Sequence, residues 1–352
     1  MEVKVCGGVR EHGRNCFLLK GSSEYIMLDC GIAGGMQRQY PDISETEAQS
    51  CQHLFLTHSH MDHCGAIAYA VQKGFRGKVW CSQDTYNQLV DKPSVVCILE
   101  EQGQEGRWIS IHDHLSMLWG RSAHCEGSVW YELRYEDKQI LYSGDYDETM
   151  IDYPCTPIRN RYADLAILDC AYGYEIADRI QLETQLLQAC QALLQQHKRI
   201  MLPLPLYGRG KTIYRLLKQL TANIGFDDCF LTNHHEPWLQ EAELISQAAC
   251  DILFLGDAQL AKEQNQHLAT TWLTQGNAIL FTGECDQSSF AYQLLQQKHC
   301  MFFRIPVHQH IKDLHQLIVQ NQFHYVLPFH HKEMDSIMVE DRQFTLRQSF
   351  IF

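Results

Sequence analysis

Short apolar segments separated by polar turns fill the first third of the chain. Residues 2–6 and 15–19 flank a glycine-rich turn, and two further apolar segments cover residues 24–28 and 53–56. Short segments of this kind, bounded by glycine, serine and aspartate, are typical of β-strands. We therefore expect strands over these four ranges, and a helix over residues 66–72.

Longer helical segments appear in the second half of the chain. The clearest, residues 182–197, is rich in Leu, Gln and Ala. Other expected strands cover residues 139–142, 165–168, 200–204, 251–255, 277–281 and 325–327, with a last helix near residues 313–319. Strands that alternate with helices and end in polar residues indicate an α/β fold whose functional side chains gather at strand ends.

The size and composition indicate a folded protein of one large domain or two smaller ones. The chain has 352 residues, of which 45% are hydrophobic and 20% charged, as in an ordinary globular protein. No apolar segment approaches the roughly 20 residues that a membrane-spanning helix needs, and the N-terminus does not resemble a signal peptide. The 15 cysteines are scattered without a C-x-x-C pair, as expected of reduced, buried thiols. These features predict a cytoplasmic protein.

The net charge of −13 with neutral histidines argues against a broad basic surface for nucleic acid. It leaves room for a local positive groove, because bound metal ions would add charge that the residue count omits. Charge alone therefore does not decide the class of substrate.

The strongest chemical signal is H-S-H-M-D-H at residues 58–63, directly after an expected strand. Imidazole and carboxylate groups suit zinc, and also manganese or iron. His58 and His60 are two residues apart at a strand end, so they can point the same way and share one ion. Asp62 and His63 follow as the chain turns and can reach a second ion. The segment therefore predicts a metal centre.

Four ligands do not complete two metal sites, because each zinc ion usually takes three or four protein groups and leaves a position for water. His124 and Asp145, in G-R-S-A-H-C-E-G and L-Y-S-G-D-Y-D, are later candidates, and a strand-end carboxylate could bridge two ions. His330 follows the expected strand at 325–327, and its neighbour His331 is an alternative ligand. Taken alone, each of these residues is weak evidence.

The order of these motifs is similar to that of a known family. T-H-S-H-M-D-H-C-G (57–65), followed by S-G-D (143–145) and a late histidine, resembles the metallo-β-lactamase superfamily. More specifically, the chain resembles its β-CASP branch of RNA- and DNA-processing nucleases, which includes RNase J-like enzymes and pre-mRNA 3′-end-processing endonucleases. Further segments that resemble this branch, in the family's order, are 7–16, 167–173, 202–211, 278–284, 308–313 and 327–333.

The resemblance implies two metal ions, expected to be Zn²⁺ with Mn²⁺ as an alternative. One ion would bind His58, His60 and His124, the other Asp62, His63 and His330, and Asp145 would bridge the two. Asp29 would orient a metal-binding histidine from behind.

The resemblance also implies which groups carry out catalysis. The reaction would depend on Asp62, Asp145 and His310, of which His310 would contact the scissile phosphate or protonate the leaving oxygen. His308 could take its place, but the residues after His310 fit the family motif better. Asp169 would hold the His310 region or a metal ligand in position.

Four residues are candidates for binding substrate. Gly208 and Arg209 would offer backbone N–H groups and a guanidinium to a phosphate at a helix start, although a plain strand-to-helix turn explains them about as well. Tyr207 and Tyr172 could stack on bases, although ordinary packing is the more common role of such tyrosines.

The implied fold is an α/β metallo-β-lactamase αββα sandwich with an inserted β-CASP-like α/β domain. The sandwich would comprise residues 1–172 and 281–352, and the insertion residues 173–280. The chain would be a compact member of the branch, without the C-terminal domain of RNase J-like enzymes.

The resulting hypothesis is a zinc-dependent hydrolase of single-stranded RNA that uses a hydroxide activated by two metal ions. Three alternatives stay open: a hydrolase of small molecules such as thioesters, lactams or cyclic nucleotides, a nuclease acting on DNA, and a non-catalytic scaffold subunit. All seven candidate positions carry ligand-type side chains, which disfavours the scaffold. The expected partner is RNA or DNA and not a membrane, with a homodimer or a protein partner as further possibilities.

Overall fold

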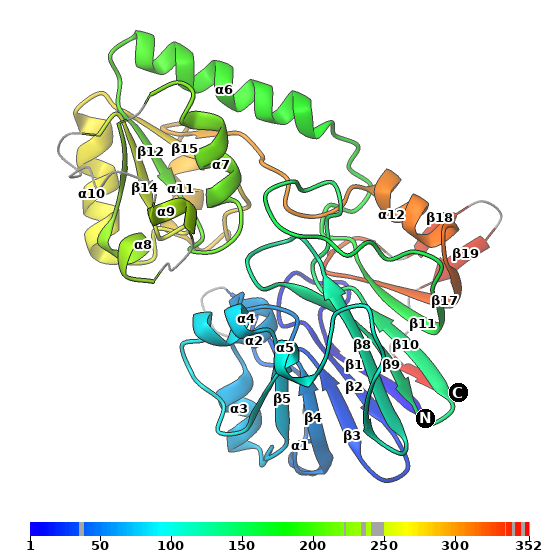
Figure 1. The fold of residues 1–352 in the computed structure, drawn as a ribbon. Coiled ribbons are helices and arrows are strands. Elements are labelled where there is room, and N and C mark those ends of the chain that lie inside the picture. Colours follow the sequence, from blue (N-terminus) through cyan, green and yellow to red (C-terminus); the bar gives the residue numbers. More distant parts are fainter. Residues whose placement is uncertain are drawn as a thin grey trace. The chain divides into compact units, whose positions relative to one another are not determined.

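Two compact units make up the chain in a computed structural model, which describes residues 1–34, 39–221, 223–233, 237–240, 250–334, 336–339, 342–345 and 349–351. The first unit comprises Met1–Ile176 and His308–Phe352, and the second comprises Ala177–Val307. The second unit is therefore an insertion between two segments of the first. Figure 1 shows the elements of both units.

Two facing β-sheets form the first unit. The seven-stranded sheet has the order β20 (Ser349–Ile351), β1 (Glu2–Gly7), β2 (Cys16–Lys20), β3 (Tyr25–Leu28), β4 (Cys51–Phe55), β5 (Lys78–Cys81) and β6 (Val96–Ile98). The six-stranded sheet has the order β17 (Gln322–Phe329), β11 (Tyr162–Asp169), β10 (Lys138–Tyr142), β9 (Val129–Tyr135), β8 (Leu115–Arg121) and β7 (Ile109–His112). Large buried side chains from both sheets, including Phe17, Trp80, Tyr131 and Phe329, form the core between them.

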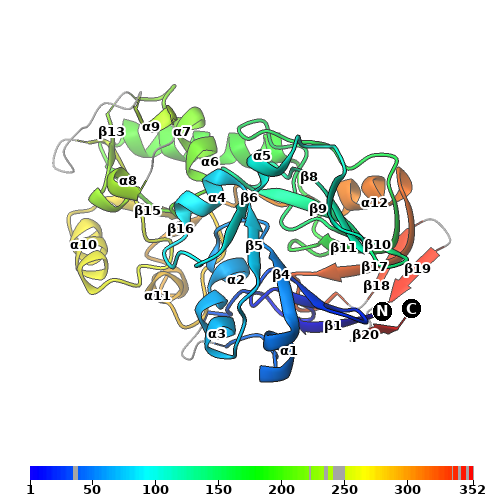
Figure 2. The same ribbon diagram turned by 60° about the horizontal axis from the view of Figure 1, so that its bottom comes forward.

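Helices cover the outer faces of both sheets (Figure 2). Ala48 of α1 (Glu45–Ser50) and Ile67 of α3 (Ile67–Gln72) pack on the seven-stranded sheet. Leu314 of α12 (Ile311–Val319) packs on the six-stranded sheet. The remaining elements of this unit are α2 (Met61–Cys64), α4 (Gln83–Gln88), α5 (Leu99–Gln102) and the hairpin of β18 (Ser336–Val339) and β19 (Arg342–Thr345). This layering confirms the predicted αββα sandwich.

Parallel strands carry the candidate residues to one end of the sandwich. In one sheet β3 runs parallel to β4, and in the other β10 and β17 run parallel to β11. Asp29 follows β3, His58 comes soon after β4, Asp145 comes soon after β10, Asp169 ends β11 and His330 follows β17. The polar residues at these strand ends are therefore close in space, as the sequence pattern predicts.

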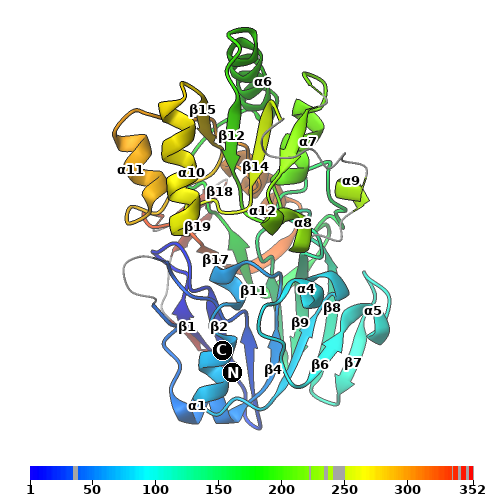
Figure 3. The same cartoon turned by 90° about the vertical axis from the view of Figure 1, so that its left-hand side faces the viewer.

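The second unit is a five-stranded parallel sheet with helices on both faces (Figure 3). Its strand order is β13 (Ile224–Phe226), β14 (Ile252–Leu255), β12 (Ile200–Pro203), β15 (Ala278–Phe281) and β16 (Met301–Phe302). One face packs on α6 (Arg179–Gln195), α7 (Gly210–Leu217), α8 (Asp228–Asn233) and α9 (Pro237–Gln240). The other face packs on α10 (Glu263–Thr274) and α11 (Phe290–Gln296). The predicted inserted α/β domain is thus present.

This insertion continues past the boundary expected at residue 280. The insertion was expected to end at residue 280, but β15, which crosses this position, pairs with β12 inside the inserted sheet. β16 then pairs with β15, so the chain leaves this unit only after Val307. Strand pairing, which the sequence motif does not encode, sets this boundary.

The helices and the cysteines agree with what the composition predicts. None of the described helices is both long and apolar enough to cross a membrane. All 15 cysteines are free thiols, and most are buried. The cytoplasmic location stays a prediction.

Glu47 links α1 to β1 and β2 through ion pairs. Its carboxylate lies 2.8 Å from Lys20 Nζ and 3.0 Å from Lys4 Nζ, and it accepts a hydrogen bond from the Ser44 backbone N–H. Burial raises the pKa of Glu47, but hydrogen bonds from Lys20, Ser44 and Lys4 outweigh burial and lower that pKa to about 2. A depressed carboxylate pKa means that the folded state gains stability above the unfolded pKa of 4.5 and loses it as the pH falls toward 2.

We predict that Glu47→Gln lowers the free energy of unfolding by about 2–3 kcal/mol at pH 7. The difference from the wild type should shrink steadily as the pH falls from 4.5 to 3, because the Glu47 carboxylate of the unfolded wild-type chain becomes protonated while that of the folded protein stays ionised. Urea unfolding across this pH range measures both effects. The control is Glu45→Gln, which changes a neighbouring exposed glutamate. If Glu47→Gln lowered the free energy of unfolding by the same amount at every pH, Glu47 would act through packing and not through its charge.

Candidate metal centre

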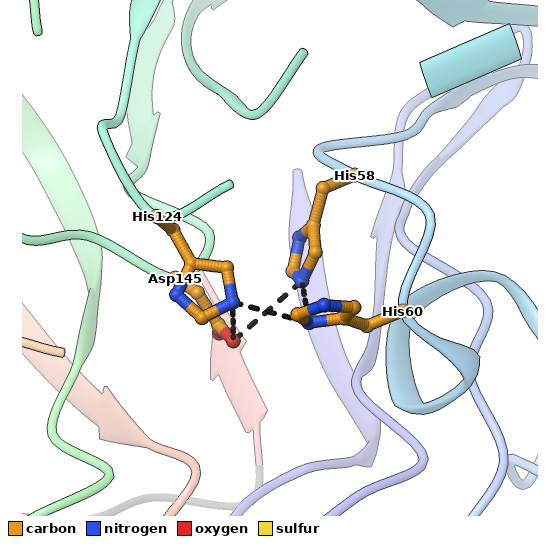
Figure 4. Close-up of side chains that lie close together, drawn as sticks. All are labelled: His58, His60, His124 and Asp145. Atoms are coloured by element: carbon orange, nitrogen blue, oxygen red, sulfur yellow. Dashed lines mark hydrogen bonds and ion pairs between the residues drawn. The ribbon is translucent and has the colours of Figure 1, made fainter. Parts of the chain in front are cut away.

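Three imidazoles and one carboxylate converge at the end of β4 and β10. His58 Nε2 and His124 Nε2 each lie 3.1 Å from His60 Nδ1. Asp145 Oδ2 lies 3.6 Å from His58 Nε2 and 3.4 Å from His124 Nε2. Figure 4 shows that the four groups point toward one another. These separations are close to the roughly 3.3 Å expected between two ligands of one tetrahedral ion with bonds of about 2.0–2.1 Å.

The other oxygen of Asp145 faces a second set of residues. Asp145 Oδ1 lies 3.0 Å from His63 Nε2 and 3.3 Å from His330 Nδ1. Asp62 Oδ2 lies 3.1 Å from His330 Nε2 and 3.7 Å from His63 Nε2. The structure therefore brings together all seven residues named as metal ligands from the sequence, in two sets that share Asp145.

Asp29 contacts His63 of this second set at Nδ1, the ring nitrogen that does not face Asp145. Its carboxylate accepts hydrogen bonds from Thr57 N (2.7 Å), Thr57 Oγ1 (2.8 Å) and Tyr142 OH (2.6 Å), and lies 2.6 Å from His63 Nδ1. An imidazole that donates from Nδ1 to a carboxylate presents the lone pair of Nε2 on its other side. Asp29 thus orients His63 so that Nε2 faces Asp62 and Asp145.

Asp169 holds a histidine other than the one favoured by the sequence motif. Asp169 Oδ2 lies 2.8 Å from His308 Nδ1, and the Gln309 side chain donates to the Asp169 carbonyl. His308 Nδ1 also lies 3.8 Å from Asp145 Oδ2. His310 is the N-cap residue of α12, and its ring centroid lies 5.2 Å from that of Tyr172. The prediction that Asp169 supports this region or a metal ligand agrees with the geometry: the side chain nearest to it is His308, not His310, and His330 Nδ1 lies 3.8 Å from Asp169 Oδ1.

The two adjacent late histidines have different surroundings. His330 is 2% exposed and lies between Asp62 and Asp145. His331 accepts a hydrogen bond from Glu333 N and lies against Gly173, where an added Cβ would be 2.5 Å from His331 Nε2. His330 is therefore the one of the pair that reaches the cluster.

Charge compensation within the cluster is strong. Burial raises the pKa of Asp145, but the charges of His63 and His330 outweigh burial and hold that pKa well below its usual value. Burial lowers the pKa of His330, but Asp145, Asp169 and Asp62 outweigh burial and hold that pKa well above its usual value. The carboxylates therefore stay ionised and demand positive charge, which imidazolium groups or a divalent cation can supply.

The residues proposed for substrate binding differ in how well they are placed. Tyr172 lies beside His308, with ring centroids 5.2 Å apart, but it is only 9% exposed. Tyr207, Gly208 and Arg209 belong to the second unit. The Arg209 guanidinium donates to the Thr282 carbonyl and packs where a Cβ on Gly283 would stand. This contact ties the loop after β12 to the loop after β15, so Arg209 has a structural role in this conformation.

Two histidines near the cluster were missed or ranked too low in the sequence. His308 was the second choice to His310 because motif matching weighs the residues that follow and not the direction of each side chain. His12 was not singled out, yet its ring stacks on His330 at 4.4 Å. The only hint was a polar histidine in the glycine-rich turn at residues 7–16.

A separate group of Glu24, His53 and His112 also has the composition of a metal site. However, Trp80 Nε1 donates to His53 Nδ1 and the His114 backbone N–H donates to His112 Nδ1. Both Nδ1 atoms are acceptors, so in neutral imidazoles the hydrogen is on Nε2, which faces Glu24 at 3.7 Å in His53 and 2.6 Å in His112. An Nε2 that carries hydrogen cannot bind a cation, so these two imidazoles are not arranged as metal ligands, although Glu24 Oε1 and His112 Nε2 are buried without a well-formed hydrogen bond.

Comparison with known proteins supports the family resemblance that the sequence motifs indicate. Residues 9–95 match the metallo-β-lactamase superfamily. The cleavage and polyadenylation specificity factor 73 of Drosophila melanogaster is 26% identical over 247 residues, which cover 62% of this chain and 36% of that protein. A ribonuclease of Thermus thermophilus is 25% identical over 242 residues, covering 62% of this chain and 54% of that protein.

Other matches extend this pattern. The endoribonuclease ysh1 of Emericella nidulans is 24% identical over 243 residues, covering 60% of this chain and 28% of that protein. The chain thus spans about half or less of the length of these three relatives.

A solved structure shows the same fold over the full length. A protein of unknown function from Enterococcus faecalis superposes with a TM-score of 0.64 at 13% identity, covering 98% of this chain and 99% of that chain. Residues 9–95 thus match the metallo-β-lactamase superfamily, and the ordered motifs and the αββα sandwich with its insertion are similar to those of that superfamily's β-CASP branch.

Proposed function

We propose that this chain is a metal-dependent phosphodiesterase that hydrolyses single-stranded RNA, with two Zn²⁺ ions, or Mn²⁺ in their place, as cofactors. The observation that carries the proposal is the position of Asp145. One of its carboxylate oxygens faces His58 and His124, and the other faces His63 and His330. A carboxylate placed in this way is suited to bridging two cations.

The residues present fit such ions. Within the described part of the chain, Asp145 Oδ1 and both ring nitrogens of His330 are buried without a well-formed hydrogen bond. Buried polar atoms rarely stay unsatisfied, so these atoms are suited to a cation. His58, His60, His124 and Asp145 would hold one ion. The other would be held by Asp62, His63, Asp145 and His330.

Hydrolysis of a phosphodiester is the chemistry that this centre suits. Divalent ions bound there would stabilise the developing charge on the phosphate and make a water acidic enough to attack near neutral pH. The chain's own residues would hold the ions, and two carboxylates orient histidines of the cluster: Asp29 contacts His63 and Asp169 contacts His308. His308 and His310 are both candidates for contacting the phosphate, and His308 has the closer approach to Asp145.

RNA is the substrate that the relatives support, because two of them are named as ribonucleases. In the first unit, Tyr172 beside His308 is a proposed contact to the strand. In the second unit, considered by itself, Tyr207 and the backbone of Gly208 are the candidates. The net charge of −13 is unfavourable for capturing RNA over a wide surface. We therefore propose that a protein partner, or a second copy of the chain, contributes to RNA capture.

The test is cleavage of labelled single-stranded RNA, and of DNA of the same sequence, by the zinc-loaded protein with and without a chelator. We expect chelator-sensitive cleavage of RNA that is lost in the Asp62→Ala, His63→Ala double variant. The His331→Ala variant is the matched control, because the His331 ring contacts Glu333 N and lies against Gly173 and is not part of the cluster, and it should cleave like the wild type. Cleavage that survives the double variant would contradict the site, and failure of a metal-loaded protein to cleave either polymer would favour the small-molecule hydrolase.

A further inference from the structure

An exposed histidine of the N-terminal turn lies flat on a buried histidine of the metal centre. The ring centroids of His12 and His330 are 4.4 Å apart, and the ring planes differ by 7°. His12, Asp62 and His330 also place possible ligand atoms within 4.8 Å of one another. His12 could therefore be a further metal ligand or a residue that positions His330.

The stacked geometry decides between these two roles. The lone pair of an imidazole nitrogen lies in the plane of the ring, and two nearly parallel stacked rings have separate planes. An ion bound to His330 in the plane of its ring would therefore be well out of the plane of the His12 ring. His12 could bind that ion only by leaving the stack, so the observed arrangement favours a positioning role.

The turn that carries His12 holds the same set of residues through other contacts. We call residues 8–15 the N-terminal clasp. The His330 backbone N–H donates to the Gly8 carbonyl at 2.7 Å, and the Asn15 backbone N–H donates to the Asp62 carbonyl at 2.9 Å. Asn15 Nδ2 also lies 2.9 Å from His63 Nε2. The clasp thus contacts three of the candidate ligands of the second ion.

His330 is the ligand that most needs this support. Its φ of 74° lies in the left-handed region, which residues other than glycine rarely adopt. Its ring must keep Nε2 near Asp62, at 3.1 Å, and Nδ1 near Asp145, at 3.3 Å. Rotation about the Cβ–Cγ bond of histidine meets only a low barrier, so a flat contact on the ring face restricts a motion that would misdirect both nitrogens.

We propose that His12 is a positioning residue that stacks on His330 and holds its imidazole in the orientation that binds the second metal ion. This inference rests on the metal centre of the proposed function and not on its substrate. Stacked ring pairs make a modest contribution, so losing the stack should weaken binding of the second ion by about 2- to 10-fold and should not abolish it.

Two variants of His12 separate stacking from direct ligation. His12→Phe keeps a flat ring but has no ligand atom, whereas His12→Ala has neither. Zinc is titrated into the full chain against a chelating indicator, and the absorption spectrum of the Co²⁺-loaded protein reports the coordination of each ion. We expect His12→Ala to weaken one of the two ions and alter its Co²⁺ bands, and His12→Phe to stay close to the wild type.

The control is His114→Ala, which removes another exposed histidine of the same unit and should bind both ions normally. Binding by His12→Phe that is as weak as by His12→Ala would overturn the stacking role, because a ligand atom would then be what matters. Wild-type binding in His12→Ala would also overturn it. A wild-type protein that holds fewer than two ions would instead overturn the metal centre of the proposed function, and the two failures are thereby distinguishable.

Discussion

Asp145→Asn should remove both metal ions and reduce RNA cleavage by on the order of 10³-fold or more. The substitution keeps the shape of the side chain but replaces the negative charge that both sets of histidines share. One carboxylate oxygen faces His58 and His124 while the other faces His63 and His330, so neither set retains its full complement of ligands. Metal content by elemental analysis and cleavage of labelled RNA measure the two effects on the same sample.

Asp137→Asn is the matched control, because Asp137 is exposed in the turn between β9 and β10. This variant should keep both ions and full activity, and both variants should show the same folded circular dichroism spectrum. An Asp145→Asn protein that still carried two ions would mean that the carboxylate does not bridge them.

Asp29→Asn should weaken metal binding by about 10- to 100-fold while the protein still folds. Asp29 contacts four donor groups, from Thr57, Tyr142 and His63. An asparagine would turn an NH₂ group toward some of them, so the Nδ1–H of His63 would lose its acceptor or the backbone of Thr57 would lose its own. The metal dissociation constants, measured by competition with a chelator, test this directly.

Tyr142→Phe tests whether Asp29 affects metal binding through its contact with His63 or through its other hydrogen bonds. It removes one of the donors that reach Asp29 but leaves the carboxylate against His63, so metal affinity should stay near that of the wild type. If Tyr142→Phe and Asp29→Asn weakened metal binding equally, the hydrogen-bonded core would matter more than the orientation of His63.

The grouping of the strand-end candidate ligands was predictable from the sequence because it depends on local geometry. His58, His60, Asp62 and His63 stand within six residues after an apolar strand, and a strand followed by a tight turn leaves their side chains few directions to take. Asp145 and His330 were predictable through family motifs and strand ends. The αββα sandwich was also predictable, because its strands appear in the sequence as short apolar segments bounded by turns.

Features that depend on contacts between distant segments were not predictable in the same way. The choice between His308 and His310 is set by how the chain enters α12, where His310 caps the helix and His308 turns toward Asp169. The stack of His12 on His330 joins residues at opposite ends of the chain. The end of the insertion depends on β16 pairing with β15, and no local signal at residue 280 reveals that pairing.

The most direct test of the two-ion centre is X-ray diffraction from zinc-soaked crystals, with anomalous scattering recorded on both sides of the zinc absorption edge. We expect two zinc peaks, one among His58, His60 and His124 and the other among Asp62, His63 and His330, with Asp145 between them. A single peak, or two peaks of which neither touches Asp145, would contradict this expectation.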